Sequence, residues 1–260
     1  MASFDYGRYA FGFDSLPLAI IGACISALYL CTASYNMAKG SSSAVRWTFF
    51  YFVLWGLFRT IGFTLRAVAL TGDNGTNLGL TVTAQTLSSI GYLPLVRVLV
   101  SGSFSCVKNG HPSFPTERLQ RFVSILFLVF TGLIINYISK STGAADLTQT
   151  DLALRDVAYW GLTLFAACPT LYAIYSISVG NVRLIKVSQV ILVQGILLLI
   201  KIGFSLYKVY NDGNPEEESF YYLFTVLPEY LYMGFHIHPW LVEQFVALDS
   251  TGRTVSESAA

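Results

Sequence analysis

The sequence contains little charge and no long polar segment. Asp, Glu, Lys and Arg together make up 12% of the 260 residues, whereas hydrophobic residues make up 54% and the mean hydropathy is +0.56. A soluble domain of this length exposes far more charge, so the composition is typical of a chain whose solvent is the membrane. The net charge of +1 gives no basic footprint, which excludes a nucleic-acid partner.

Motifs for nucleotide binding and covalent catalysis are missing as well. The chain has no Walker loop, no dinucleotide glycine motif and no Gly-x-Ser-x-Gly elbow. We therefore expect neither ATP-driven activity nor a cofactor. His236 and His238 are two residues apart and would point to nearly opposite faces of a helix, so we expect no metal site.

What the sequence does have is about seven long apolar stretches. A helix that crosses the hydrocarbon core needs roughly 20 mostly apolar residues. Such stretches occur at 16–38, 47–71, 79–104, 119–140, 156–178, 187–209 and 220–242. They are continuous and do not alternate with a period of two, which favours helices over barrel strands. We predict an all-α polytopic membrane helix bundle at 1–248, followed by a disordered cytosolic tail at 249–260.

The basic residues predict the orientation of this bundle. With the amino terminus outside, eight Lys and Arg fall on the inner side and four on the outer side. An excess of Lys and Arg near the spans marks the cytosolic side, so the amino terminus is predicted outside and the carboxyl terminus inside. The inner set is Lys39, Arg46, Lys108, Arg118, Arg121, Arg183, Lys186 and Arg253, and the outer set is Arg8, Lys140, Arg155 and Lys208.

This orientation places a glycosylation sequon outside. The sequon, Asn74-Gly75-Thr76, lies close to the second span, which disfavours its use. The expected location is an integral membrane protein of the endoplasmic reticulum or the plasma membrane.

Two parts of the chain resemble each other. Ile61-Gly62-Phe63-Thr64-Leu65 in the second span matches Ile202-Gly203-Phe204-Ser205-Leu206 in the sixth, and the next span in each case carries a Leu-Pro pair, at 93–94 and 227–228. This pattern indicates two three-helix repeats, 16–104 and 156–245, around a linking helix; the alternative is chance similarity between apolar segments. Proline bends a helix, so matched prolines predict matched kinks.

Ionisable residues occur inside the predicted spans. Such side chains are costly in a bilayer and usually face the bundle interior. At a rise of ~1.5 Å per residue, Lys201 and Glu229 lie about 12 and 13 Å inside the outer ends of spans six and seven. We expect these two side chains to face each other, with Arg59 on the same cavity. Arg66 and Arg97 lie nearer to span ends and are expected to snorkel outward and inward respectively.

These charges define a candidate ligand site. Its predicted members are Arg59, Lys201, Glu229, Gln85, Gln194 and Tyr230. A basic group that Glu229 does not neutralise is able to bind a phosphate, a carboxylate or a polarised oxygen on a lipophilic ligand. The alternatives are a structural Lys201–Glu229 ion pair that joins two helices, or an unpaired Glu229 that acts as a proton donor.

Several of these segments resemble an uncharacterised family of fungal seven-span membrane proteins. The resemblance is carried by Phe58-Arg59-Thr60-Ile61-Gly62, Leu87-Ser88-Ser89-Ile90-Gly91-Tyr92-Leu93-Pro94-Leu95, Leu154-Arg155, Lys201-Ile202-Gly203-Phe204-Ser205-Leu206 and Glu229. More distantly, the chain is similar to the fungal lipid-translocating exporter family. Lys201 on span six, the acidic outer loop Glu216 to Glu218 and the closing His238-Pro239 carry that similarity. It implies a fungal membrane protein that handles amphipathic molecules.

Two functions are consistent with these features. The first is binding or translocation of a lipid-like or hydrophobic small molecule without ATP hydrolysis, with membrane lipids and an amphipathic small molecule as partners. The second is an intramembrane enzyme of lipophilic secondary metabolism, an isoprenoid or terpenoid cyclase or isomerase, with Glu229 as its general acid. The sequence leaves open which of the two applies.

Overall fold

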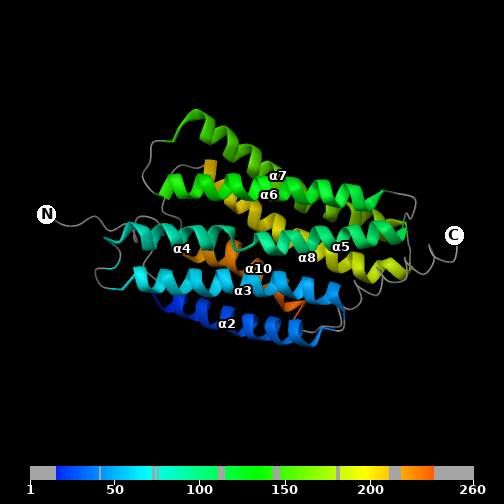
Figure 1. Ribbon diagram of the computed structural model, residues 1–260, viewed down its shortest axis with the longest axis horizontal. Coiled ribbons are helices and arrows are strands. Elements are labelled where there is room, and N and C mark those ends of the chain that lie inside the picture. Colours follow the sequence, from blue (N-terminus) through cyan, green and yellow to red (C-terminus); the bar gives the residue numbers. More distant parts are fainter. Residues whose placement is uncertain are drawn as a thin grey trace.

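The computed structural model describes residues 16–40, 42–71, 74, 76–110, 115–142, 147–179, 182–210 and 218–236, and within these residues the chain is all-helical (Figure 1). The long helices are α2 (Leu16–Lys39), α3 (Ser43–Ala69), α4 (Leu78–Ile90), α5 (Leu93–Gly110), α6 (Thr116–Thr142), α7 (Gln149–Ser178) and α8 (Val182–Tyr210). A last segment comprises α9 (Glu218–Tyr221), the π-helix η2 (Tyr222–Val226) and α10 (Leu227–Gly234). The predicted tail at 249–260 lies outside the described residues.

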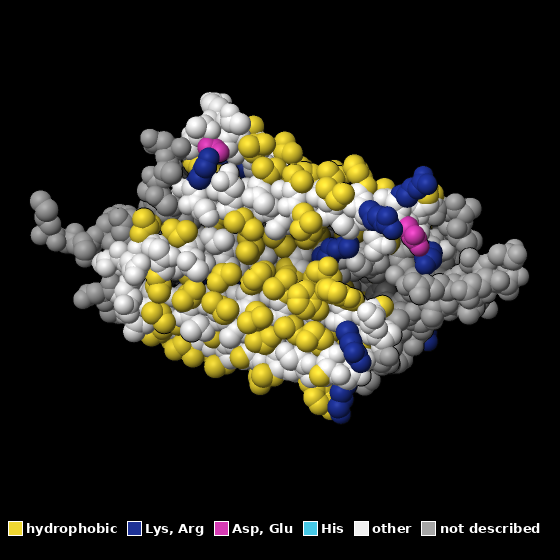
Figure 2. Space-filling model, viewed as in Figure 1, with side chains coloured by type: hydrophobic (Ala, Val, Ile, Leu, Met, Phe, Trp, Pro, Cys, Tyr) yellow, Lys and Arg dark blue, Asp and Glu magenta, His cyan; other side chains and the backbone are white. Residues whose placement is uncertain are grey.

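The helices have the length and composition of membrane spans. Six spans in the described residues are long and apolar enough to cross a bilayer, with α4 and α5 together forming the third, Leu78–Lys108. They confirm the first six predicted spans, and the last segment falls in the seventh. Large apolar side chains cover much of the visible face (Figure 2), while several polar and charged side chains are buried inside. The protein is therefore a polytopic integral membrane helix bundle.

Successive spans run in opposite directions, with α4 and α5 in line as one span, so the basic residues can be grouped by the end of the bundle at which they lie (Figure 1). At one end, Lys39 closes α2, Lys108 lies in the last turn of α5, and Arg118 and Arg121 lie near the start of α6. Figure 2 shows Lys and Arg side chains gathered toward this end. It is the end predicted to face the cytosol, and we refer to it below as the basic end.

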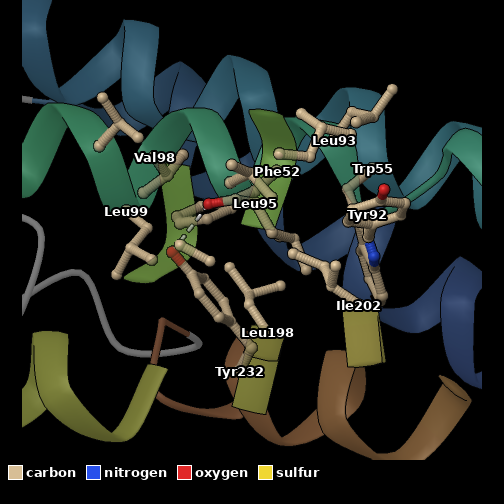
Figure 3. Packing of buried hydrophobic residues seen from close by; sticks show 14 of the residues in the cluster. Phe52, Trp55, Tyr92, Leu93, Leu95, Val98, Leu99, Leu198, Ile202 and Tyr232 are labelled. Carbon is tan, nitrogen blue, oxygen red and sulfur yellow. Dashed lines mark hydrogen bonds between the residues drawn. The ribbon is translucent and has the colours of Figure 1, made fainter. Parts of the chain in front are cut away.

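Helix α5 occupies the middle of the bundle. It packs against α3, α6, α7 and α8, and from Leu93 to Val100 its side chains are buried on nearly every face, as expected for a helix surrounded by others. Figure 3 shows Leu95, Val98 and Leu99 of α5 among side chains of α3, α8 and α10. Tyr232 of α10 donates a hydrogen bond to the Leu95 carbonyl at 3.1 Å, which fixes the last segment against α5.

Both Leu-Pro pairs coincide with interruptions of regular helix. Pro94 lacks an N–H, and the third span is broken at Gly91 and Tyr92, between α4 and α5. Pro228 is the second residue of α10, which follows directly on the π-helix η2. Pro169, by contrast, lies inside a continuous α7. The matched prolines thus mark matched breaks, although duplication of the two halves stays a prediction.

Candidate functional site

A buried ion pair joins α3 to α10. Arg59 and Glu229 are each 1% exposed, and the guanidinium contacts the carboxylate at two points: Nε donates to Oε2 at 2.6 Å and Nη2 donates to Oε1. Trp55, one turn before Arg59, donates from Nε1 to Oε2 at 2.9 Å. Both carboxylate oxygens therefore accept charge-assisted or neutral hydrogen bonds, which offsets the cost of burying the pair.

The same guanidinium caps the broken helix. Arg59 Nη1 donates to the Ser88 carbonyl at 2.8 Å, in the last turn of α4, where carbonyls have no partner within the helix. Gly91 lies directly against this group, because a Cβ at that position would be 3.0 Å from Arg59 Nε. Arg59 thus connects α3, the end of α4 and α10.

Lys201 is not paired with Glu229, which corrects the expectation that the two would meet. Lys201 on α8 is 2% exposed, and its Nζ lies 3.7 Å from the centroid of the Tyr92 ring and donates to Ser205 Oγ at 3.3 Å. No ion pair within 4.0 Å joins it to a carboxylate of the described residues. The physical reason is that Arg59 and Trp55 already occupy the Glu229 carboxylate.

Arg66 differs from expectation as well. It was expected to snorkel outward from α3, but its side chain is buried. Its guanidinium carbon lies 4.9 Å from the centroid of the Tyr221 ring and 6.0 Å from that of Tyr222. These rings at the start of the last segment hold the cation inside by cation–π contact.

The other predicted site residues are dispersed. Tyr230 Oη donates to the Gly22 carbonyl at 2.9 Å and is hydrogen-bonded to Ser26, so it fastens α10 to α2. Gln194 on α8 is buried and hydrogen-bonded to His236 at 2.6 Å.

Two further residues of interest lie outside these contacts. Gln85 is half-buried on α4. Asn74, the glycosylation candidate, is exposed, and its side-chain amide donates to the Thr71 carbonyl at 3.0 Å.

A cavity of about 890 Å³ opens at the basic end of the bundle. Figure 2 shows a hollow in the visible face, bordered by Lys and Arg side chains. The cavity is lined by the start of α3, by α5 from Arg97 to Lys108, by the start of α6 and by two residues of α8. Its walls combine aromatic side chains such as Trp47, Tyr51 and Phe104 with hydroxyl and amide groups. Its charged members are Arg97, Lys108, Arg121 and Glu117.

Arg97 is the deepest of these charges and does not snorkel to the span end as expected. Helix α5 continues to Gly110, so about 20 Å of helix separates Arg97 from that end, which is farther than an arginine side chain reaches. Instead, Arg97 turns into the cavity, where its Nη1 is buried and has no hydrogen-bond partner in the part of the chain that the structure describes.

The charged cluster that the sequence predicted and the cavity are thus two separate regions. Arg59 and Glu229 meet in a packed core beside Lys201, and of the six predicted ligand-binding residues Gln194 alone lines the described cavity. The cavity itself was not predicted, because side chains of four helices, α3, α5, α6 and α8, build it together. The one available signal was Arg97, an intramembrane charge.

Comparison with family models, with curated proteins and with solved structures finds no match to this chain. The resemblance to the fungal membrane families stays a prediction, and the site is interpreted from its geometry.

Proposed function

We propose that this integral membrane protein binds a lipid-like or amphipathic small molecule in the cavity at the basic end of the bundle and moves it without ATP hydrolysis. The cavity carries the proposal. Its volume of about 890 Å³ lies within the range of small-molecule sites, ~300–1,000 Å³. Its walls offer aromatic and apolar surface together with a few charged groups, which is the composition that an amphipathic molecule requires.

The rim of the cavity favours a ligand with an apolar chain. Trp47 and Ile125 belong to its lining and are 60% and 62% exposed on the outer surface of the bundle. In a membrane this surface meets lipid tails, so the cavity wall continues into the apolar exterior. A molecule with a polar head and an apolar chain would contact both surfaces at once.

The interrupted helices support movement of the ligand rather than binding alone. Non-helical backbone inside the membrane is tolerated where protein buries it or where it lines a cavity, and transporters place such breaks beside their substrate sites. Here the α4–α5 break precedes Arg97 by a few residues on the same span. The predicted similarity to lipid-translocating exporters, and a fungal endoplasmic reticulum or plasma membrane location, form part of this proposal.

The contacts of Glu229 favour binding over the enzymatic alternative. A general acid must present a proton to its substrate. Both Glu229 oxygens instead accept hydrogen bonds from Arg59 and Trp55, and the side chain is buried away from the cavity lining.

Filling the cavity tests the proposed function. Ser101 lies in the lining on α5, and Ser101→Trp would place an indole in the cavity. Purified full-length protein in phosphatidylcholine nanodiscs is titrated with radiolabelled oleate and with oleyl alcohol. We expect Ser101→Trp to weaken binding of both ligands at least about 10-fold, because a bulky side chain displaces ligand volume.

The matched control is Ser178→Trp, an exposed serine at the end of α7 outside the cavity lining. It should bind both ligands as the unchanged protein does. If Ser101→Trp folds, as judged by its melting temperature and monodispersity, and binds both lipids normally, the cavity is not the site.

A further inference from the structure

Arg97 is a charged side chain whose own protein surroundings do not satisfy it. The third span runs from Leu78 to Lys108, and Arg97 lies four residues past its centre, about 6 Å along the helix axis. A guanidinium at that depth is costly unless a partner compensates it, and its buried N–H groups each require an acceptor. Nη1 of Arg97 is buried without one in the described residues.

No carboxylate of the described residues pairs with Arg97. The ion pairs found there are Arg59–Glu229, Lys140–Asp151 and Arg155–Asp156. The acid that lines the cavity, Glu117, is exposed in the first turn of α6 and forms no ion pair with Arg97 within 4.0 Å. The other charged side chains of the lining, Lys108 and Arg121, are cations, so basic side chains outnumber acidic ones in the described lining.

We propose that Arg97 binds an oxyanion, a phosphate or a carboxylate, carried on the ligand of this cavity. The proposal rests on the proposed function and specifies its ligand class: an amphipathic anion rather than a neutral lipid. A guanidinium has a planar fork of donors that matches either oxyanion at two points. Arg121 adds positive potential at the mouth, while Trp47 and Ile125 provide the surface for the apolar chain.

Paired ligands that differ in charge test this inference. Full-length protein in phosphatidylcholine nanodiscs is titrated with oleate against oleyl alcohol, and with lysophosphatidate against monoacylglycerol. We expect each anion to bind about 10–100-fold more tightly than its uncharged counterpart, the range for charge-assisted hydrogen bonds in a site shielded from water. Inorganic phosphate is added as a competitor, because a free anion and a lipid headgroup share this chemistry.

Two variants assign the preference to Arg97. Arg97→Gln should bring the affinity for each anion down to that for the uncharged lipid, which should itself not change. Arg97→Lys, which keeps the charge but loses the fork, should retain part of the preference. The matched control is Arg118→Gln, which removes an exposed arginine of α6 outside the cavity lining and should retain the full preference.

Each outcome distinguishes this inference from the proposed function. Equal binding of charged and uncharged lipids by the unchanged protein would overturn the oxyanion site and leave the lipid-binding proposal intact. If the unchanged protein binds neither the charged nor the uncharged lipids, both the oxyanion site and the lipid-binding proposal are overturned. If Arg118→Gln loses as much of the preference for anions as Arg97→Gln does, the oxyanion site at Arg97 is overturned. Displacement by millimolar phosphate would support a free anion as ligand, and displacement by chain-bearing anions alone would support a lipid headgroup.

Discussion

The charges buried in the core are compensated in different ways. Arg59 and Glu229 neutralise each other, whereas Lys201 lies on the face of Tyr92, where the ring quadrupole attracts the ammonium group. The sequence correctly indicated that all three are buried, because exposure to lipid would cost too much. The sequence predicted Lys201 as the partner of Glu229, whereas the structure shows Arg59. Equal depth on two consecutive helices does not indicate whether a residue of another helix, here α3, lies closer.

The ion pair gives a prediction at the residue scale. Glu229→Gln should lower the free energy of unfolding by about 3–5 kcal/mol, because it leaves the Arg59 charge buried without a counter-charge. Removing both charges in Arg59→Gln/Glu229→Gln should cost less than the sum of the two single changes. Thermal and denaturant unfolding in detergent micelles measure this cycle. As a control, Lys140→Gln breaks the half-exposed pair with Asp151 and should cost about 1 kcal/mol or less.

A variant of Lys201 tests whether Arg59 is the energetically relevant partner of Glu229. Lys201→Met preserves most of the side-chain length and removes a cation that has no carboxylate within 4.0 Å in the described residues. We expect it to be neutral or slightly stabilising, because an unneutralised buried charge is lost. If Lys201→Met destabilises the protein as much as Arg59→Gln, then Lys201 is the energetically relevant partner of Glu229.

At the scale of helices, the apolar runs and prolines predicted most of the observed elements. The first six spans and the interruption at each Leu-Pro pair follow from apolar length and from the missing proline N–H. The extension of α5 to Gly110, beyond the predicted end at 104, was not predicted, because Ser103, Ser105 and Lys108 lower the apolar signal. These polar side chains are accommodated because α5 lies inside the bundle and Ser105 and Lys108 line the cavity.

Close helix packing gives a prediction at the element scale. Gly56 lets α3 approach α2, since a Cβ there would lie 2.9 Å from Leu30 Cβ and 3.0 Å from the Leu30 Cα of the backbone. Membrane helices associate through such small residues. Gly56→Ala should therefore cost about 1–3 kcal/mol of stability, as overpacking does in other cores. The measurement is the melting temperature in detergent.

The matched control is Gly203→Ala on α8, in the segment that resembles the surroundings of Gly62. A Cβ at Gly203 meets nothing within 4 Å, so the substitution should be neutral or stabilise the helix by up to about 1 kcal/mol. Equal effects of the two alanines would mean that the α2–α3 contact does not limit stability.

For the whole molecule, the membrane explains why apolar side chains lie outside and charges inside. That inversion could be predicted from composition, but the cavity could not. Its lining comes from α3, α5, α6 and α8, which span residues 44 to 194, and apolar periodicity does not indicate which of these helices leave space between them. The Lys and Arg side chains at the basic end are the residues that predict the orientation of the bundle, and the cavity opens at the same end. The orientation of the bundle therefore decides which compartment the cavity faces.

That orientation is open to direct measurement. Asn74 and Arg118 are both exposed and lie at opposite ends of the bundle, beyond α3 and in the first turn of α6. Single cysteines, Asn74→Cys or Arg118→Cys, are introduced after Cys24, Cys31, Cys106 and Cys168 are replaced by alanine. In sealed microsomes with the cytosolic face outward, a membrane-impermeant maleimide should label Arg118→Cys at once and Asn74→Cys only after detergent is added, because the excess of Lys and Arg holds the α6 start in the cytosol. The reverse pattern would place the amino terminus in the cytosol and the mouth of the cavity in the lumen, and an amphipathic anion would then enter the cavity from the lumenal side.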